Sequence, residues 1–161
     1  MESPAETRRR LIDLLQLAYS GEKAAALAYR GHARSVRDPH QRAAIEKIER
    51  DEWIHREKVG RLLQRLGAAP RPLKEIRPSL VGSVLGLLCR VSGWFLPMYF
   101  AGRLETKNVV EYDRAATWAR ELGLTDFLPD LSEMAAVEVE HEAFFFGVLG
   151  RSAPRRVSPA K

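Results

Sequence analysis

Cysteine is almost absent from this chain, and several common functional signals are missing altogether. Cys89 is the only cysteine in 161 residues, so an internal disulfide is excluded, as is an iron site built from four thiolates of one chain. No glycine-rich nucleotide fingerprint is present, so electrons for a redox reaction would have to come from an external donor. No segment shows the convincing alternation of apolar and polar residues that is typical of strands. The sequence therefore predicts an all-α protein.

Strong charge of one sign is lacking as well. With 45% apolar and 29% charged residues, the chain has the composition of a single soluble or membrane-peripheral domain. The net charge of +5 favours an anionic surface such as lipid headgroups, although an inert basic surface fits equally well. No nucleic-acid-binding motif is present, so no nucleic-acid partner is predicted. Arg8, Arg9 and Arg10 precede an amphipathic pattern instead of a continuous apolar stretch, so no signal peptide is expected.

The longest apolar stretch, residues 80–102, is too broken to span a membrane. Arg90 and Pro97 interrupt it, and each piece is about half of the roughly 20 apolar residues that a spanning helix needs. One interpretation is a helix that lies in the membrane surface without crossing it. The other is a crossover helix buried against the bundle or against a second copy of the chain in a homodimer. The interfacial anchors predicted by the first interpretation are Trp94, Phe95, Tyr99 and Phe100.

Two Glu-x-x-His quartets, Glu52 to His55 and Glu138 to His141, are the most informative motifs. Residues three apart lie on one face of a helix, so each quartet directs a carboxylate and an imidazole to the same point. A Glu-x-x-His from each of two helices, with a lone Glu from each of two others, is the ligand set of di-iron carboxylate four-helix bundles. The lone Glu residues here are Glu22 and Glu105.

The register of the apolar residues supports this interpretation, because all four Glu lie within core stripes. Steps of three and four recur along four segments, as on the buried face of a bundle helix. These stripes are Leu11, Leu15, Ala18, Glu22, Ala25 and Tyr29; Ile45, Ile48, Glu52, His55, Val59, Leu62 and Leu66; Met98, Ala101, Glu105, Asn108, Tyr112, Ala115 and Ala119; and Leu131, Met134, Glu138, His141, Phe145 and Val148. Burying four carboxylates without partners is costly, so a cationic partner is predicted, and two divalent metal ions would suffice.

Capping sequences and glycines predict where the helices begin and end. Helix ends are expected near Gly67 and Gly123, and residues 68–79 are expected to form a proline-containing loop. The predicted helix starts are Ser3 to Glu6, Asp38 to Gln41 and Asp130 to Glu133. The chain is thus predicted to be one domain over residues 1–150, followed by a flexible basic tail over 151–161.

Together these motifs resemble the demethoxyubiquinone hydroxylase family, membrane-associated members of the ferritin-like superfamily. The resemblance covers roughly residues 10–149. The matching motifs are Gly21-Glu22 with Ala25 and Tyr29-Arg30-Gly31, Glu49 to His55, Arg77-Pro78 before the apolar segment, Glu105 with Tyr112, and Glu138 to His141. Bacterioferritin and rubrerythrin share the ligand types but lack the apolar insert. The chain departs from the family pattern at Thr106, Val110-Glu111 and Glu142.

The resemblance implies a ferritin-like antiparallel four-helix bundle with an extra apolar helical segment between its second and third helices. It implies two iron ions, and manganese suits the same ligands. One ion would take Glu22, Glu52 and His55 and the other Glu105, Glu138 and His141, with Glu52 and Glu138 bridging. The expected roles of several other residues are less specific. Tyr29 and Tyr112 either hydrogen-bond a ligand, relay a proton or electron, or pack in the core. Asn108 is a candidate partner of Glu105, His32 and His40 are expected to be inert, and Cys89 is expected to be a small buried hydrophobe.

The resulting hypothesis is a di-iron monooxygenase that hydroxylates a quinone-like, membrane-resident substrate. It would use O2 and an external electron donor, and it would lie in the cytoplasm, peripherally on the inner face of the cell membrane. Two alternatives stay open. The first is a ferroxidase or peroxide-scavenging protein of the bacterioferritin or rubrerythrin type. The second is a non-catalytic protein in which the metal only stabilises the bundle.

Overall fold

The computed structural model describes residues 3–152, with residues 72–79 and 151–152 described in their backbone only. No strand occurs within this part of the chain, so the prediction of an all-α protein is confirmed. Five α-helices and one 3-10 turn follow one another as α1 (Pro4–Ser35), α2 (Pro39–Arg65), α3 (Pro72–Leu88), α4 (Phe95–Glu121), η1 (Thr125–Phe127) and α5 (Leu128–Ser152).

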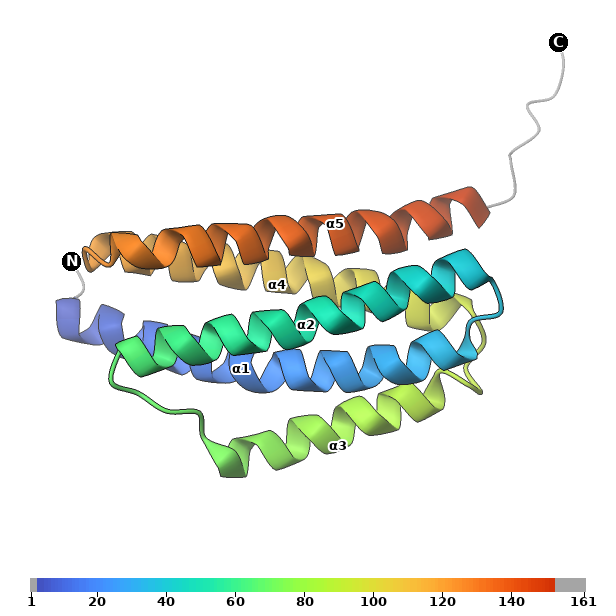
Figure 1. Ribbon diagram of the computed structural model, residues 1–161, viewed down its shortest axis with the longest axis horizontal. Helices are drawn as coiled ribbons and strands as arrows, with labels where there is room; N and C mark the ends of the chain where they lie inside the picture. Colours follow the sequence, from blue (N-terminus) through green and yellow to red (C-terminus); the bar gives the residue numbers. More distant parts are fainter. Residues whose placement is uncertain (1–2, 153–161) are drawn as a thin grey trace, which may run out of the picture.

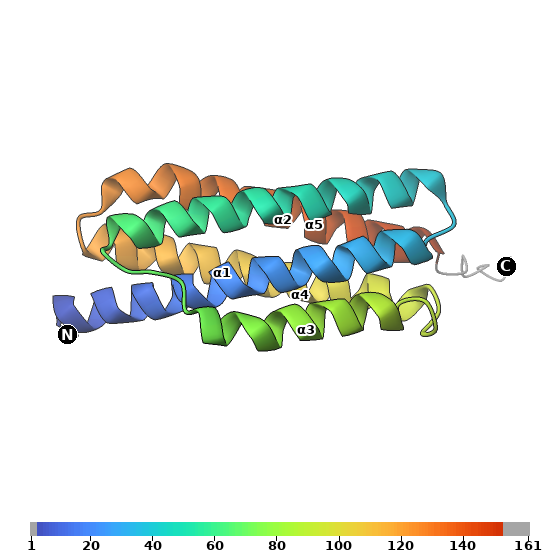
Figure 2. The ribbon, with the colours of Figure 1, turned by 60° about the horizontal axis from the view of Figure 1, so that its bottom comes forward.

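Helices α1, α2, α4 and α5 form an antiparallel bundle, and α3 lies outside it (Figure 1). Helix α1 contacts α2 and α4, while α4 packs along α5. Since α2 and α4 run in the same direction, the chain must return along the bundle between them, and α3 is that return (Figures 1 and 2). The predicted bundle with an inserted helical segment is therefore the observed architecture.

The predicted capping residues start the first two helices. The side chain of Ser3 accepts a hydrogen bond from the Glu6 amide at 3.3 Å, and that of Asp38 accepts one from the Gln41 amide at 2.9 Å. Gly67 and Gly123 follow the ends of α2 and α4 with φ angles of 66° and 71°, a conformation that residues with a Cβ rarely adopt.

Two predicted boundaries are wrong. The last helix begins at Leu128 and not at Asp130, because a 3-10 turn leads directly into it. The segment predicted as a loop over 68–79 is helical from Pro72, since proline is well tolerated in the first turn of a helix. Helix α5 runs to Ser152, and the remainder of the predicted basic tail lies outside the described residues.

The apolar segment 80–102 is divided between two helices. Its first part ends α3 and its last part begins α4, and a turn containing Gly93 (φ 77°) connects them. Glycines let α3 approach α1 closely: a Cβ at Gly82 would lie 2.2 Å from the carbonyl oxygen of Ala24, and one at Gly31 would lie 2.3 Å from the Cα of Gly86. One face of α3 is thus held on the bundle as a crossover helix.

The apolar core is split into two clusters by the polar residues of the four stripes. One cluster lies toward the N-terminus of α1 and includes Leu15, Leu62 and Leu131, all at most 1% exposed. The other lies toward the opposite end and includes Ile45 and Phe145, both fully buried. Along each bundle helix the Glu of the stripe falls between the two clusters, so the carboxylates are sealed on both sides by packed apolar side chains.

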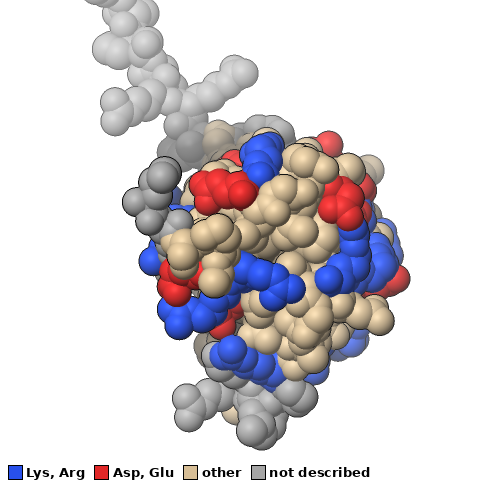
Figure 3. Space-filling model, turned by 90° about the vertical axis from the view of Figure 1, so that its left-hand side faces the viewer, with Lys and Arg blue, Asp and Glu red and all other residues tan. Residues whose placement is uncertain are grey.

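The surface is basic without a single concentrated patch on the end that Figure 3 shows. This end carries the α2–α3 and α4–α5 connections, and Lys and Arg side chains are spread over it with fewer Asp and Glu between them. Within residues 3–152, no helix combines the length and apolar character that crossing a membrane requires.

Candidate metal centre

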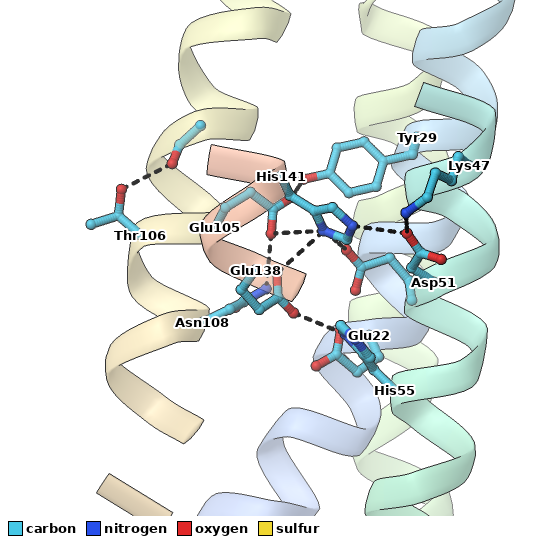
Figure 4. A network of polar contacts seen from close by, with 12 residues as sticks. Glu22, Tyr29, Lys47, Asp51, His55, Glu105, Thr106, Asn108, Glu138 and His141 are labelled. Atoms are coloured by element: carbon cyan, nitrogen blue, oxygen red, sulfur yellow. Dashed lines mark hydrogen bonds and ion pairs between the residues drawn. The ribbon is translucent and has the colours of Figure 1, made fainter. Parts of the chain in front are cut away.

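The structure brings all six predicted ligand residues together at the middle of the bundle, and Figure 4 labels five of them. Each side chain is at most 3% exposed: Glu22, Glu52, His55, Glu105, Glu138 and His141. They form two overlapping groups. Within each group, every residue offers one potential ligand atom, and these atoms all lie within 4.8 Å of one another. One group is Glu22, Glu52, His55 and Glu138; the other is Glu52, Glu105, Glu138 and His141. Glu52 and Glu138 belong to both groups, which is the position a bridging residue requires.

Unpaired polar atoms concentrate in this cluster. Of the described residues, those with a buried side-chain oxygen or nitrogen lacking a hydrogen-bond partner include Glu22, Glu52, Glu138 and His141, and both oxygens of Glu52 are affected. Buried polar groups are almost always hydrogen-bonded, and leaving one unpaired costs roughly 1–3 kcal/mol. Carboxylate oxygens and imidazole nitrogens suit iron and manganese. The donor set and its unpaired atoms therefore fit divalent metal ions.

The carboxylates cannot all be charged at neutral pH without a cation. Burial, strengthened by the neighbouring charge of Glu138, raises the pKa of Glu22, Glu52 and Glu105. Burial acts in the same direction on Glu138, but the attraction of its carboxylate to the nearby Glu105 carboxyl and to the two imidazoles outweighs burial and lowers its pKa. Without a metal, Glu22, Glu52 and Glu105 therefore hold their protons to a higher pH than ordinary carboxyls do, while Glu138 stays ionised to a lower pH.

The two imidazoles are held in different ways. His55 Nδ1 lies 3.0 Å from Oε1 of Glu138, within the cluster. His141 turns its Nε2 outward to Oδ2 of Asp51 at 3.0 Å, and Lys47 binds the same oxygen at 2.7 Å (Figure 4). Its Nδ1 is left facing the carboxylates, 3.5 Å from Oε2 of Glu138. A carboxylate on the outer nitrogen of a ligating His fixes the ring and its tautomer.

Asp51 contacts the centre through His141, although the sequence analysis does not single it out. It directly precedes Glu52 and so falls off the buried stripe, where an acidic residue suggests an ordinary surface role. Partial burial acts to raise its pKa, but the hydrogen bonds from Lys47 and His141 outweigh burial and lower it. Lys47, four residues earlier on the same helix, is the only local signal that could have indicated a fixed carboxylate.

The two predicted tyrosines connect the halves of the cluster. The hydroxyl of Tyr29 on α1 donates to Oε1 of Glu105 on α4, and that of Tyr112 on α4 donates to Oε1 of Glu22 on α1. Both tyrosines are also core residues, at 3% and 2% exposure. The predicted hydrogen bond to a Glu of the cluster and the predicted core packing therefore occur together. The amide of Asn108 lies 3.5 Å from Oε2 of Glu105, as predicted.

An apolar cavity of about 490 Å³ lies between α1, α3 and α4 and reaches this centre at Tyr29. Its lining residues include Leu85, Leu88, Leu96 and Phe100, whose side chains are 46–64% exposed on the molecular surface. The cavity is therefore open to the outside through an apolar surface. A much smaller cavity of about 80 Å³ lies farther along α1 and α4, against Glu22 and Tyr112, and shares Leu104 with the first.

The surface around this opening is unusually apolar. We call it the apolar face; it consists of Leu80, Val81, Val84, Leu85, Leu87, Leu88, Val91, Phe95, Leu96, Tyr99 and Phe100, each at least 40% exposed. Trp94, predicted as an anchor on this surface, does not belong to it. Its ring packs against the core and its Nε1 donates to Oε1 of Gln41 at 3.0 Å. His32, expected from the sequence to be inert at a helix end, lies in the last turn of α1, where it is buried and lines the cavity.

The fold and the cluster define a class of protein: an antiparallel helical bundle with a buried carboxylate–imidazole centre that could hold metal ions. A family model described as ubiquinone biosynthesis protein COQ7 matches residues 9–142, most of the chain. The chain belongs to this family, which confirms its resemblance to the demethoxyubiquinone hydroxylases.

Two individual proteins are also similar to this chain, one in sequence and one in fold. A 3-demethoxyubiquinol 3-hydroxylase of Alcanivorax borkumensis is 31% identical over 88 residues, which are 53% of this chain and 40% of that protein. The match thus spans less than half the length of that relative. A crystal structure of a protein from Xanthomonas campestris has a TM-score of 0.75 with 18% identity, over 91% of this chain and 92% of the other. That similarity shows a common fold.

Proposed function

We propose that this protein is a di-iron monooxygenase that hydroxylates a quinone-like ring with O2 and electrons from an external donor. The observation that carries the proposal is the apolar cavity that opens on the apolar face and is lined by Tyr29, whose hydroxyl donates to Glu105 of the cluster. A water-soluble substrate such as ferrous iron would gain nothing from such a passage, which favours a hydroxylase over a ferroxidase. The relative from Alcanivorax borkumensis is named as a hydroxylase of a ubiquinol.

Two iron ions would be held by six residues, with Glu52 and Glu138 bridging them. Glu22 and His55 would complete the first site, and Glu105 and His141 the second. When bound, the ions supply the redox chemistry that activates O2, which no side chain of this protein can provide. The assignment is supported by the two overlapping groups of ligand atoms, in which these two Glu are the common members.

The protein's own side chains would hold the centre in place and keep water away from it. Asp51 fixes the ring of His141 from outside, so that Nδ1 faces the carboxylates. Burial and the nearby carboxylates raise the pKa of Tyr29 and Tyr112 well above the usual 10, so both hydroxyls keep their protons and remain hydrogen-bond donors. Each tyrosine thereby fixes the carboxylate of the opposite half.

The apolar face would lie in the surface of an anionic membrane. Eleven exposed apolar side chains contribute to it, and the cavity opens among them. Arg90 is the only charged residue between Leu80 and Gly102, and the net charge of the chain is +5, which favours anionic headgroups around the inserted face. A lipid-soluble ring could then pass from the bilayer into the cavity without crossing water.

The test is a turnover assay with the iron-loaded full chain, a short-chain demethoxyquinone analogue, a chemical reductant and O2. Mass analysis should detect a product one oxygen atom heavier, and the Glu138→Ala variant should produce none. If the loaded protein forms no hydroxylated product, quinone hydroxylation is the wrong activity. Iron counting separates the ferroxidase alternative, because storage proteins accumulate far more than the about two ions per chain of a di-iron site.

A further inference from the structure

His32 has a buried polar atom for which the protein supplies no partner. Its side chain is 2% exposed, and its Nε2 makes no hydrogen bond. Among the described residues, the only other imidazole nitrogen in this position is Nδ1 of His141, which belongs to the carboxylate cluster. An unpaired buried polar atom destabilises the folded chain, so its presence points to a partner from outside.

The position of His32 links it to the centre. It follows Tyr29 by one helical turn, and both rings stack on Phe145, with centroid distances of 5.6 Å for Tyr29 and 6.2 Å for His32. Both residues line the same apolar cavity. The hydroxyl of Tyr29 is already engaged with Glu105, whereas Nε2 of His32 is not engaged. Of these two cavity-lining residues, His32 is therefore the one whose buried polar atom has no partner in the protein.

We propose that His32 is a positioning residue, whose Nε2 hydrogen-bonds an oxygen substituent of a quinone-like ring in the apolar cavity. The identity of the ring rests on the proposed function; the residue that orients it is the new element. Apolar walls hold a flat ring by contact area alone and distinguish its orientations poorly, while one polar group among them selects the edge that carries oxygen.

The imidazole is suited to either oxidation state of such a ring. Burial lowers the pKa of His32 to about 4, so it is neutral at physiological pH. A neutral imidazole nitrogen either donates its proton to a carbonyl or ether oxygen, or accepts one from a ring hydroxyl, depending on the tautomer. His32 also lines a second, more polar cavity together with Cys89, so it stands where the apolar cavity meets polar surroundings.

The experiment compares two probes on the iron-loaded full chain. One is a short-chain methoxy-substituted benzoquinone and the other is an alkylbenzene of similar size without ring oxygen, both measured by equilibrium binding. His32→Leu should weaken binding of the quinone about tenfold and leave the alkylbenzene unchanged. His32→Gln should recover most of the loss, since an amide can make the same hydrogen bond. Cys89→Ala changes the wall of the same cavities and should affect neither probe selectively.

Unchanged quinone affinity in His32→Leu, or an equal loss for both probes, would overturn the proposal, as would a His32→Gln variant that recovers nothing. Metal content and melting temperature report whether each variant folds, and His32→Met replaces His32→Leu if the latter does not. Failure of the proposed function is a separate outcome. It would appear as the absence of hydroxylated product from the unaltered chain, while the comparison of the two probes could still support a ring-binding role for His32.

Discussion

The interior of the bundle and its apolar face both depart from the usual distribution of residues, in opposite directions. At the centre, four carboxylates and two imidazoles lie at most 3% exposed among packed apolar side chains. On the outside of α3 and α4, apolar side chains such as Val91 and Phe100 are 80% and 64% exposed. Outside this face, the described residues expose only scattered large apolar side chains, which are Leu17, Ile54, Val110 and Val139.

Both departures cost free energy in the isolated chain, and each therefore points to a partner of opposite character. Buried carboxylates need a cation or protons, and an exposed apolar surface of this extent needs lipid or another apolar surface. The cavity at Tyr29 joins the two regions, which suggests that the partners serve one reaction. The comparison becomes sharper when each region is altered without disturbing the other.

The largest effect is expected from removing a bridging carboxylate. Glu138→Ala or Glu52→Ala should lower the bound metal from about two ions per chain to one or none, because each residue serves both sites. Glu22→Ala should be milder, since water can replace a terminal ligand. Elemental analysis of the purified protein measures the effect, and Glu140→Ala, which removes an exposed carboxylate of the same helix, is the matched control. Full metal content in both bridging variants would refute the ligand assignment.

The next largest effect is expected from chelation of the metal, which should lower the thermal stability of the protein. Removing the metal leaves the interior carboxylates without their counter-charge, and the melting temperature should fall by about 10 °C. Differential scanning calorimetry before and after treatment with a chelator gives the shift. Val91→Ser, which changes only the apolar face, should melt like the unaltered protein in both conditions. A melting temperature that is indifferent to chelation would argue strongly against a buried metal cluster.

The metal-free protein should become more stable as the pH falls from 7 toward about 5. Glu22, Glu52 and Glu105 have a pKa raised above the usual 4.5, so the folded state binds protons that the unfolded state lacks, and the stability they contribute is lost as pH rises through the raised values. The raised pKa of His55 acts in the same direction. Glu138, whose pKa is lowered, opposes them only below about 4.5.

One group works against this trend in the same range. His32 is neutral in the folded state, with its pKa lowered to about 4, so it destabilises the protein as pH falls below 6.5. Four raised groups should outweigh it. Urea unfolding of the chelated protein at several pH values measures the slope, which should be reduced in Glu52→Gln. A metal-free protein that loses stability steadily between pH 7 and 5 would contradict the protonation of the buried carboxylates.

The smallest effect on the folded protein is expected from the apolar face. Val91→Ser combined with Phe95→Ser, at 80% and 58% exposure, should weaken binding to vesicles containing anionic lipid by about tenfold or more, while metal content stays unchanged. Ile54→Ser, at 50% exposure on α2, is the matched control and should leave vesicle binding intact. Vesicle co-sedimentation measures the change. If the double variant instead splits a dimer and never affects lipid binding, the face is an interface between two copies.

Much of the site can be predicted from the sequence because residues spaced three or four apart lie on the same face of a helix. Glu52 and His55 fall on a stripe of steps of three and four, and such a stripe is buried in a bundle whatever the remaining sequence does. The same argument placed Glu22, Glu105 and Tyr112 correctly. Local rules failed where an assignment depended on contacts between helices. Asp51 lies off the stripe, yet α5 brings His141 to it.

His32 and Trp94 both have surroundings that differ from those expected from the sequence. His32 lies near the end of α1, where a helix often meets water, but α3 and Phe145 cover it. Trp94 lies within an apolar segment and is predicted from the sequence to be a membrane anchor. In the structure its ring packs inward, and Gln41 of α2 accepts a hydrogen bond from its indole N–H. In both cases the sequence specifies the residue type while a helix distant in sequence decides its surroundings.

The sequence by itself determined the all-α class, the four buried stripes and the six candidate ligands, because helical periodicity is a local property of the chain. The family resemblance already implied that Glu52 and Glu138 serve both ions, and the structure places these two carboxylates in both ligand groups. Only the tertiary structure decided that Tyr29 and Tyr112 bond across the halves. It alone placed α3 on α1 through glycine contacts and thereby formed the cavity. Those features depend on how helices far apart in the chain approach one another, which spacing along a single helix does not specify.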